Sequence, residues 1–200
     1  MLKQLVDTTK TALIVIDIQN DYCAPDGKIA KDVGLDVSQL QQTVSKLITF
    51  VDKAREVGLP IIFTQMIEDP KYMAPNAKFK SNGRDLCSPN TKGFEYYKIK
   101  PQPNDSQLIK KTYDAFSNPE LNEILKRHDI ENLIIVGAYT AVCVDTTLRT
   151  GYTKGYNIVI PEDLVGMPEE RMYQHKASLD VWRLIFAHVV DSEEIISLWE

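Results

Sequence analysis

An acid, an amine and a thiol stand at the ends of short expected strands or shortly after them. They are Asp17 near the end of Thr11–Ile18, Lys110 and Lys111 at the end of Gln107–Lys111, and Cys143 a short turn after Leu133–Gly137. Strands of an open parallel sheet present their carboxyl ends at one edge, so we expect these groups to converge. A thiol at a helix N-terminus beside an ammonium has a lowered pKa, and a nearby carboxylate can carry its proton to a leaving amine. The set predicts nucleophilic acyl transfer through a thioester.

Each of these residues also has a structural interpretation. An Asp at a strand end can serve as a turn or cap residue, a Lys there can extend into solvent, and a Cys between apolar residues can belong to the core. The residues alone leave open whether Lys110 or Lys111 is the amine. The shared edge of the sheet favours the catalytic interpretation, in which backbone N–H groups before Cys143 would face a developing oxyanion.

Helices and strands alternate along the chain. Helical spacing predicts a helix over Val37–Val57, with Asp36 as its N-cap and Gly58 just past its end, followed by a strand that opens after Pro60. Further helices are expected after Ser117 or Asn118, over 142–154, over 169–187 with Leu184 and Ile185 among its apolar residues, and from Ser192; further strands are expected over 156–160 and 188–190. The pattern predicts an α/β fold with three layers, doubly wound, its sheet mostly parallel and its helices on both faces, in one domain over 1–200.

One long segment departs from this alternation. The residues from Ile67 to Asp105 lack regular periodicity and include five prolines. Segments of this length are commonly functional. The aromatic residues there favour a packed lid that selects the substrate; they are Tyr72, Phe79, Phe94, Tyr96 and Tyr97.

The overall composition narrows the classes of function. The 200 residues include 23 basic and 28 acidic side chains, a net charge of −5, so no basic surplus exists to bind nucleic acid. No apolar run approaches the roughly 20 residues of a membrane span, and no signal peptide is evident at the N-terminus, so no membrane association is expected. Three cysteines argue against a disulfide framework, and the expected location is the cytoplasm.

Several motifs in the chain resemble those of the isochorismatase-like cysteine hydrolases, in the order that the family has them. Asp17-Ile-Gln-Asn-Asp-Tyr22 is similar to the family's D-x-Q-N-D-F, and Lys110-Lys-Thr-Tyr-Asp-Ala-Phe116 is similar to its K-x-x-Y-S-A-F. Gly137-Ala-Tyr-Thr-Ala-Val-Cys143-Val resembles its G-x-x-T-x-x-C-V, and Thr147-Leu-Arg149 and Glu162-Asp163 continue the match. The resemblance covers nearly the whole chain.

This resemblance implies a catalytic triad of Asp17, Lys110 and Cys143, because the family's Lys precedes the Tyr by three positions. It also implies an oxyanion hole made by the backbone N–H groups of Tyr139 and Cys143, with a cis peptide bond at Ala138–Tyr139. Gln19 and Tyr113 are expected to line the substrate pocket, although simple packing is an alternative for both.

Three departures from the family pattern accompany these matches, and the mildest is Tyr22 in place of the Phe of D-x-Q-N-D-F. Asp114 replaces the Ser of Y-S-A-F, which is expected to put a charge near the site. Thr150-Gly151 replaces an Asp-Ala that usually follows Arg149 in the family.

Within the family, nicotinamidases bind a metal through an Asp and two His after the second strand. The corresponding stretch here, Thr64–Pro70, has no His, and His128, His175 and His188 are expected to be surface or core residues. We therefore expect neither a metal nor another cofactor. The stretch from Gly93-Phe-Glu95 through Pro101, with Asp105 and Lys110 beyond it, resembles the ureido- and carbamoyl-cleaving members.

The resemblance therefore implies hydrolysis of a C–N bond in a small amide, carbamoyl or ureido substrate by a homo-oligomeric enzyme. Three alternatives remain open at this point. They are a vinyl-ether hydrolase of the isochorismatase type, a metal-dependent nicotinamidase, and a binding protein without catalytic activity.

Overall fold

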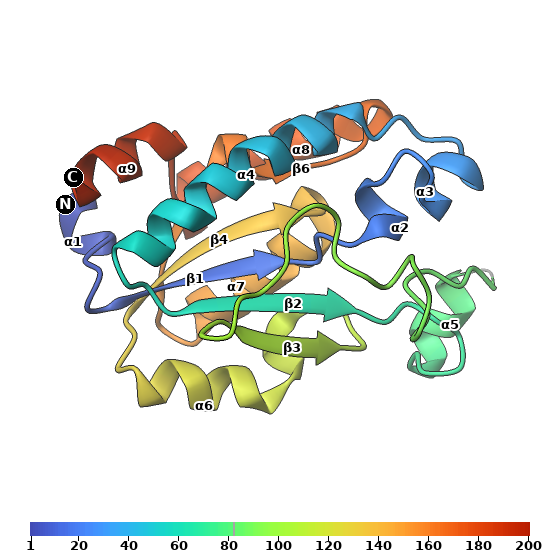
Figure 1. Cartoon of the computed structure of the whole chain (residues 1–200), viewed down its shortest axis with the longest axis horizontal. Helices are drawn as coiled ribbons and strands as arrows, with labels where there is room; N and C mark the ends of the chain where they lie inside the picture. Colours follow the sequence, from blue (N-terminus) through green and yellow to red (C-terminus); the bar gives the residue numbers. More distant parts are fainter. Residues whose placement is uncertain (82) are drawn as a thin grey trace.

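A parallel β-sheet organises the protein. The structure, a computed structural model, describes residues 1–81 and 83–200, and within them seven strands lie in the order β3-β2-β1-β4-β5-β7, with β6 beside β4 (Figure 1). Every paired strand is parallel. The strands are β1 (Thr11–Ile16), β2 (Ile61–Met66), β3 (Ser106–Lys110), β4 (Asn132–Ala138), β5 (Asn157–Pro161), β6 (Val165–Gly166) and β7 (His188–Val190). The predicted α/β class is confirmed, and the sheet is parallel throughout where the sequence predicted a mostly parallel one.

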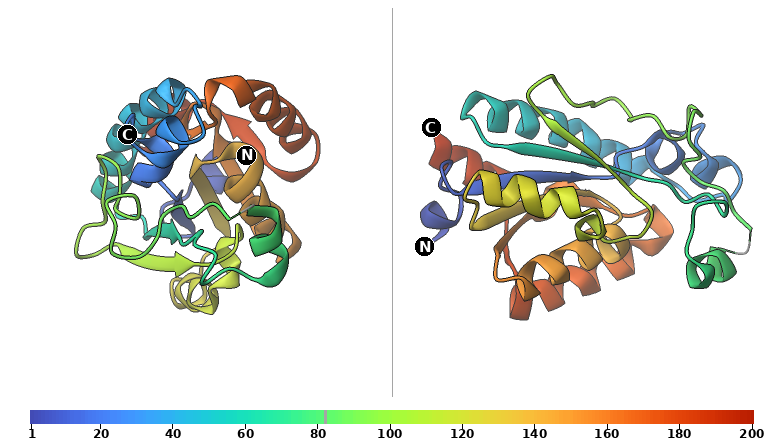
Figure 2. Two further views of the ribbon diagram at one scale, coloured as in Figure 1. Left: turned by 90° about the vertical axis from the view of Figure 1, so that its right-hand side faces the viewer. Right: turned by 90° about the horizontal axis from the view of Figure 1, so that it is seen from below.

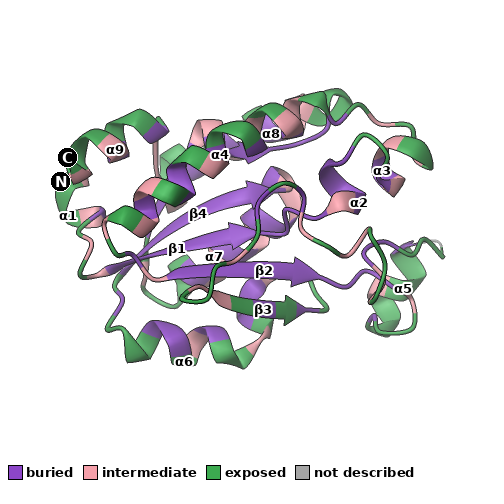
Figure 3. Ribbon diagram, viewed as in Figure 1, coloured by how far each residue is buried: buried purple, intermediate pink, exposed green. Residues whose placement is uncertain are grey.

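Helices cover both faces of this sheet (Figure 2). One face carries α1 (Leu2–Leu5), α4 (Ser38–Glu56) and α9 (Ser192–Trp199), and the other carries α6 (Pro119–Arg127), α7 (Asp145–Thr153) and α8 (Met172–Val181). Alternate residues of β1 feed the two cores, because successive side chains of a strand point to opposite faces: Leu13 and Val15 join the α4 side, and Ile14 and Ile16 join the α7 side. The central strands are buried and the outer helix surfaces are exposed (Figure 3).

Local signals mark the end of α4 and the start of α6, and the start of α4 is shifted by one residue. Gly58 ends α4 with φ +78°, and the Asn118 side chain caps α6 by accepting the Glu120 N–H at 3.0 Å. The N-cap of α4 is Val37 instead of the predicted Asp36. The Asp36 carboxylate still accepts the Ser38 N–H at 2.8 Å, so it satisfies a helix donor from one position earlier.

The C-terminal part of the predicted 169–187 helix is corrected by the structure. The α-helix ends at Val181 and a π-helical turn, Trp182–Phe186, follows it. Trp182 is completely buried, whereas Leu184 and Ile185 are 82% and 55% exposed. A π turn holds more residues than an α turn and rotates the later side chains around the axis, so the apolar face predicted from helical spacing does not continue.

The long segment after β2 lies across the carboxyl ends of the strands and contains one helix, α5 (Pro75–Ser81), that the sequence did not predict. Tyr97 is buried and Phe94 and Tyr96 are half-buried, as expected of a packed lid, but Tyr72 and Phe79 are exposed. Two short helices, α2 (Asn20–Cys23) and α3 (Lys28–Lys31), lie at the same end of the sheet. Across residues 1–81 and 83–200, no helix combines the length and the apolar character needed to cross a membrane.

Candidate active site

The carboxylate of Asp17 lies directly after β1 and is completely buried. Its backbone takes a φ of +47°, a left-handed conformation that Asp tolerates better than most residues. The hydroxyl of Thr64, from the neighbouring strand β2, donates to Asp17 Oδ1 at 2.7 Å, while Oδ2 lies 2.7 Å from Lys110 Nζ. The sequence analysis did not single out Thr64, whose role depends on the register of β1 and β2.

The structure chooses between the two adjacent lysines at the end of β3. Lys110 is 2% exposed, and its ammonium also donates to the backbone oxygens of Thr112 at 3.1 Å and Tyr113 at 3.2 Å. Lys111 is exposed, with its ammonium 5.6 Å from the ring centre of Tyr72. Successive strand residues face opposite sides of the sheet, so only Lys110 reaches Asp17.

Cys143 lies in a π-helical turn, Thr140–Val144, between β4 and α7. Its Sγ is 3.5 Å from Lys110 Nζ, so the acid, amine and thiol predicted to converge do meet. Gly137 makes this approach of β4 to β1 possible, since it has φ +118° and a Cβ there would lie 2.2 Å from the Ile16 carbonyl oxygen. The expected α-helix starts only at Asp145.

Burial dominates the electrostatics of the thiol. It raises the pKa of Cys143 well above the ordinary thiol value, although the Lys110 ammonium acts in the opposite direction. Burial also opposes the charge on Lys110, but the Asp17 carboxylate and the sulfur outweigh it and raise the pKa of that lysine. The resting site therefore holds a neutral thiol beside an ion pair, and the predicted lowering of the thiol pKa is wrong.

Tyr139 begins the turn that carries Cys143. The peptide bond between Ala138 and Tyr139 is cis, as the resemblance implied. The Tyr139 hydroxyl donates to the backbone oxygen of Tyr22 at 3.3 Å, and the two rings pack with centroids 5.3 Å apart. These contacts hold the backbone of Tyr139 at the wall of a pocket.

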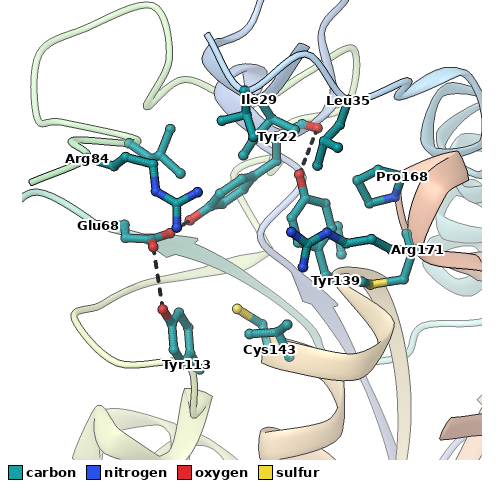
Figure 4. A pocket seen from close by; sticks show the side chains of 15 residues that line it. Tyr22, Ile29, Leu35, Glu68, Arg84, Tyr113, Tyr139, Cys143, Pro168 and Arg171 are labelled. Atoms are coloured by element: carbon teal, nitrogen blue, oxygen red, sulfur yellow. Dashed lines mark hydrogen bonds between the residues drawn. The ribbon is translucent and has the colours of Figure 1, made fainter. Parts of the chain in front are cut away.

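This pocket has a volume of about 200 Å³, and Cys143 lines it (Figure 4). Much of its wall is apolar, formed by Ile29, Val33, Leu35, Leu86, Val142 and Met167. Neither Asp17 nor Lys110 is among the residues that line the pocket, and both are almost completely buried.

A carboxylate that the sequence analysis missed lies in the same pocket. Glu68 accepts hydrogen bonds from the hydroxyls of Tyr22 at 2.9 Å and Tyr113 at 3.4 Å. Burial raises the pKa of Glu68, and the Tyr22 hydrogen bond and the Arg84 charge moderate that shift. Glu68 belongs to the stretch Thr64–Pro70, and nothing local in that stretch marks it as a pocket residue.

Charged groups occupy two sides of the thiol. Glu68, Arg84 and Tyr113 gather on one side of Cys143 in Figure 4, and Arg171 lies on the other side, near Tyr139. Arg84 donates to the Ser81 carbonyl at 3.3 Å. Arg171 forms no ion pair with the residues that the structure describes, so its guanidinium is available to an anionic ligand.

Of the two expected pocket residues, Tyr113 lines the pocket and Gln19 does not. Tyr113 lines the pocket, and burial raises its pKa to about 12, so its hydroxyl remains a donor. Gln19 is completely buried and is not among the lining residues, which corrects that prediction. Its amide nitrogen donates to the carbonyls of Met66 and Phe94, both at 3.0 Å, and its amide oxygen accepts the Met66 N–H at 2.7 Å.

The residues after Gln19 extend this structural role. The Asn20 side chain donates to the Lys92 carbonyl at 2.8 Å, and Asp21 accepts the Cys87 N–H at 2.7 Å. Gly93 is required here, because a Cβ at that position would lie 2.2 Å from the Asp21 carboxylate. The Gln-Asn-Asp part of the first motif therefore fastens the long segment over the site instead of binding a ligand.

Two of the departures from the family pattern, Asp114 and Thr150, meet in the structure. Asp114 accepts the Phe116 N–H at 2.9 Å through Oδ1 and the Thr150 hydroxyl at 2.9 Å through Oδ2. The family pattern has Ser and Asp at these two positions, and this chain has Asp and Thr, so the carboxylate and the hydroxyl have exchanged places. The charge expected near the site is thus engaged in a hydrogen bond between the loop and α7, and Asp114 is not among the pocket-lining residues.

Other predicted features lie away from the thiol. Asp105 pairs with Arg55 of α4 at 2.7 Å, and Glu95 is exposed outside the pocket. His128 is exposed, His188 is half-buried in β7, and His175 is buried in α8. Within the described parts of the chain, no three His, Cys, Asp or Glu side chains are grouped closely enough to hold a metal ion. The donor set of a metal-dependent nicotinamidase is therefore not assembled among these residues.

Comparisons with known proteins find relatives in sequence and in fold. A sequence profile described as "Isochorismatase domain" matches residues 11–194. The chain is 31% identical over 194 residues to the ureidoacrylate amidohydrolase RutB of Caulobacter segnis, covering 88% of this chain and 80% of the relative. In fold it is similar to a cysteine hydrolase from Pseudomonas syringae pv. phaseolicola, with a TM-score of 0.85, 21% identity and 98% and 94% of the two chains covered. It is also similar to the N-carbamoylsarcosine amidase from Thermoplasma acidophilum, with a TM-score of 0.76, 23% identity and 92% and 97% covered.

Proposed function

We propose, from the premise that the chain belongs to the isochorismatase family, that it is a cysteine hydrolase cleaving a C–N bond of a small amide, carbamoyl or ureido compound. One observation carries the proposal: a thiol lining a small pocket lies 3.5 Å from an ammonium that in turn lies 2.7 Å from a carboxylate. All three groups are at least 95% buried. Cys143 is the nucleophile, Asp17 the general base and acid, and Lys110 the group that stabilises charge on both.

The first half of the reaction forms a thioester. Asp17 takes the thiol proton as Cys143 Sγ bonds to the substrate carbonyl carbon, and the backbone N–H groups of Tyr139 and Cys143 stabilise the oxyanion. The C–N bond then breaks as Asp17 returns the proton to the leaving nitrogen. Because burial raises the pKa of the Cys143 thiol, we place this proton transfer together with the attack.

The second half of the reaction hydrolyses the thioester. Asp17 removes a proton from water, whose oxygen attacks the thioester carbon. The C–S bond breaks, and the proton passes to the departing sulfur, which restores the neutral thiol. Lys110 keeps its charge throughout and holds Asp17 Oδ2 beside the sulfur.

The pocket supports a substrate that carries a carboxylate. The names of two similar proteins, ureidoacrylate amidohydrolase and N-carbamoylsarcosine amidase, each combine a ureido or carbamoyl group with an acid. Arg171 on one side of the thiol would bind such a carboxylate. Glu68 on the other side would accept N–H bonds from the carbamoyl or ureido nitrogen.

A substitution at Arg171 tests this assignment. Arg171→Ala is expected to raise KM for an N-carbamoyl amino acid by roughly 10- to 100-fold, because it removes a charge-assisted hydrogen bond, while kcat changes little. The matching uncharged amide should show no such effect. Arg127→Ala, which removes an exposed arginine from α6 outside the pocket, is the control. An equal rise in KM for the charged and uncharged substrates would contradict carboxylate binding at Arg171.

The activity itself is tested by measuring ammonia and amine release from a panel of amides, ureas and N-carbamoyl acids, with Cys143→Ser as the control. Turnover that depends on Cys143 supports the proposal. Turnover of isochorismate that survives in Cys143→Ser would instead indicate the vinyl-ether hydrolase. A requirement for added metal would indicate the nicotinamidase type, and tight binding without turnover would indicate a binding protein.

The exposed side chains of the π turn after α8 support association with a second copy of this chain. Leu184 is largely exposed at a groove that Tyr152, Tyr156 and Phe186 also line, together with the polar side chains of Asn157, Arg183 and His188. A projection and a groove on one face suit a two-fold interface, in which each copy inserts its projection into the other. We therefore propose that the protein is a homo-oligomer, as the resemblance implied, and that this face forms its interface.

Sedimentation velocity tests this assembly. The unaltered chain is expected to sediment as a dimer or larger species, and Leu184→Glu is expected to shift it to the monomer, because a charge would be buried at the interface. Phe79→Glu changes another exposed apolar side chain, on α5, and should leave the assembly intact. A Leu184→Glu oligomer as stable as the unaltered one would place the interface elsewhere.

The remaining features are proposed on simpler grounds. All three cysteines are free thiols, as in proteins of a reducing compartment, which supports a cytoplasmic location. The triad supplies nucleophile, base and cation from protein side chains, so the reaction proposed here needs no metal or organic cofactor. We also propose that residues 1–200 form one hydrolase domain.

A further inference from the structure

The turn that carries Cys143 is fastened to α8 by a buried hydrogen bond. Thr140, the first residue of the π-helical turn, is completely buried, and its Oγ1 lies 2.9 Å from His175 Nδ1. His175 is 8% exposed and lies in the first half of α8. The contact joins residues 35 positions apart and is not part of the triad.

The position of Thr140 makes this contact relevant to catalysis. It directly follows Tyr139, whose backbone N–H belongs to the proposed oxyanion hole, and it precedes the nucleophile by three residues. The backbone oxygen of Tyr139 accepts from both Val142 at 3.0 Å and Val144 at 3.2 Å, the irregular pattern of a π turn. The hydrogen bonds within a π turn are less regular than those within an α-helix. A hydrogen bond from Thr140, the first residue of this turn, to another helix therefore fixes the orientation of the turn.

The imidazole is suited to this task. Burial lowers the pKa of His175, with Glu162 opposing that shift and Lys176 and Arg183 adding to it, so the ring is neutral at neutral pH. The helix that carries His175 is also connected to the pocket wall, because the segment just before α8 supplies Met167, Pro168 and Arg171 to the pocket. Movement of α8 would therefore displace both the nucleophile and the proposed carboxylate-binding arginine.

We propose that His175 is a positioning residue for the nucleophile, acting through Thr140 to hold the Tyr139–Cys143 backbone in the register that the acylation step requires. His175 does not touch the substrate and takes no proton in the reaction. This inference rests on the proposed function for its kinetic consequence, but its structural part concerns only the placement of Cys143. Misplacement of a reacting group by about 1 Å can cost on the order of 100-fold in rate.

The test uses two pairs of variants. His175→Leu and Thr140→Val each remove the hydrogen bond, whereas His175→Asn and Thr140→Ser can keep it. We expect the first pair to lower kcat by roughly 10- to 100-fold with KM within about twofold, and the second pair to retain most of the rate. The double variant His175→Leu/Thr140→Val should be no slower than either single variant, because both remove the same interaction.

Leu179→Ala provides a matched control for stability. Leu179 is a buried residue one turn further along α8, so its truncation weakens the packing of the helix and leaves Thr140–His175 intact. It should lower the melting temperature with kcat nearly unchanged. If the His175 and Thr140 variants lose activity only to the extent that Leu179→Ala does, or if their effects add in the double variant, the positioning role is wrong.

The rate at which iodoacetamide alkylates Cys143, followed by mass spectrometry, gives a second readout that needs no substrate. We expect His175→Leu and Thr140→Val to lower this rate equally, because the sulfur no longer faces its base. A rate within twofold of the unaltered chain in both variants would overturn the inference. Absence of turnover in the unaltered chain, with these alkylation effects present, would instead overturn the proposed function alone.

Discussion

Replacing Cys143 by alanine is expected to lower turnover by on the order of 10⁴-fold or more, because no other side chain can form the covalent intermediate. The substitution removes one sulfur from a buried turn and leaves the Asp17–Lys110 ion pair in place. The fold should therefore persist, with an unchanged circular dichroism spectrum. Acid-quenched samples of the unaltered enzyme should carry the acyl group on the peptide containing Cys143, and samples of the variant should carry none.

The electrostatics of the site also predict how the alkylation of Cys143 depends on pH. Because burial raises the pKa of Cys143, the thiolate is scarce at neutral pH and becomes more abundant only as the pH rises through that raised value. Alkylation by iodoacetamide should thus be slow at pH 7 and should accelerate into the alkaline range. Rapid alkylation well below pH 8, as expected of the lowered thiol pKa that the sequence predicted, would mean that the Lys110 charge outweighs burial.

Serine at position 143 distinguishes the mechanisms. Cys143→Ser keeps a nucleophilic atom in nearly the same volume, but its hydroxyl is a poorer nucleophile in a site arranged for sulfur, so its turnover should also collapse. Substantial turnover in both the serine and alanine variants would show that water attacks the substrate directly. In that case Asp17 would act as a base toward water, and the thioester pathway would be excluded.

The proposed catalytic residues could be located from the sequence because each stands at, or a short turn after, the end of an expected strand. The expected strands correspond to β1, β3 and β4, parallel connectivity implied that their ends meet, and the motif spacing selected Lys110 over Lys111. The structure gives the selection a physical reason, since strand alternation sends only one of two adjacent lysines inward. The chemical type of each residue and its position relative to a strand end were thus sufficient to predict that the thiol, the amine and the acid lie close together.

Features that depend on three-dimensional partners could not be predicted in this way. Gln19 belongs to a motif beside a catalytic residue, and only the course of the 86–97 segment shows that its amide binds backbone groups. The carboxylate of Glu68 is held at the pocket by the hydroxyls of Tyr22 and Tyr113, which belong to motifs far from it in the sequence. The thiol pKa was predicted from a helix dipole and a nearby cation, but desolvation is a property of the whole packed site.

Irregular helical turns account for other errors. The two π turns, at 140–144 and 182–186, each follow or precede an α-helix that the sequence predicted as one continuous element. In the first, the extra residue places Cys143 toward the pocket before α7 begins. In the second, it turns Leu184 and Ile185 to the surface. Periodicity based on 3.6 residues per turn has no means of detecting either change.

Breaking the buried ion pair one residue at a time is expected to damage both stability and activity. Lys110→Met leaves the Asp17 carboxylate without its cation, and Asp17→Asn leaves the ammonium with only backbone and sulfur partners. Each should lower the free energy of unfolding by about 3–5 kcal/mol, because a charge remains buried without its counterion. Each should also reduce turnover by at least about 10³-fold, since the proton carrier or its cation is lost.

The double variant Asp17→Asn/Lys110→Met separates these two effects. It contains no uncompensated buried charge, so most of the lost stability should return, as when a buried pair is replaced by neutral residues. Turnover should remain as low as in the single variants, because neither the base nor the cation is present. Urea denaturation and ammonia release, measured on the same four proteins, give the two sides of this comparison.

An exposed ion pair serves as the control for charge removal in general. Lys53 and Glu56 face solvent on α4 and interact across one helical turn, so Lys53→Met should change neither stability nor turnover appreciably. If the double variant is as unstable as the single ones, the two buried residues contribute separately and not as a pair. If Asp17→Asn keeps its turnover, the carboxylate is not the base, and its burial beside Lys110 serves only to neutralise the lysine that faces the sulfur.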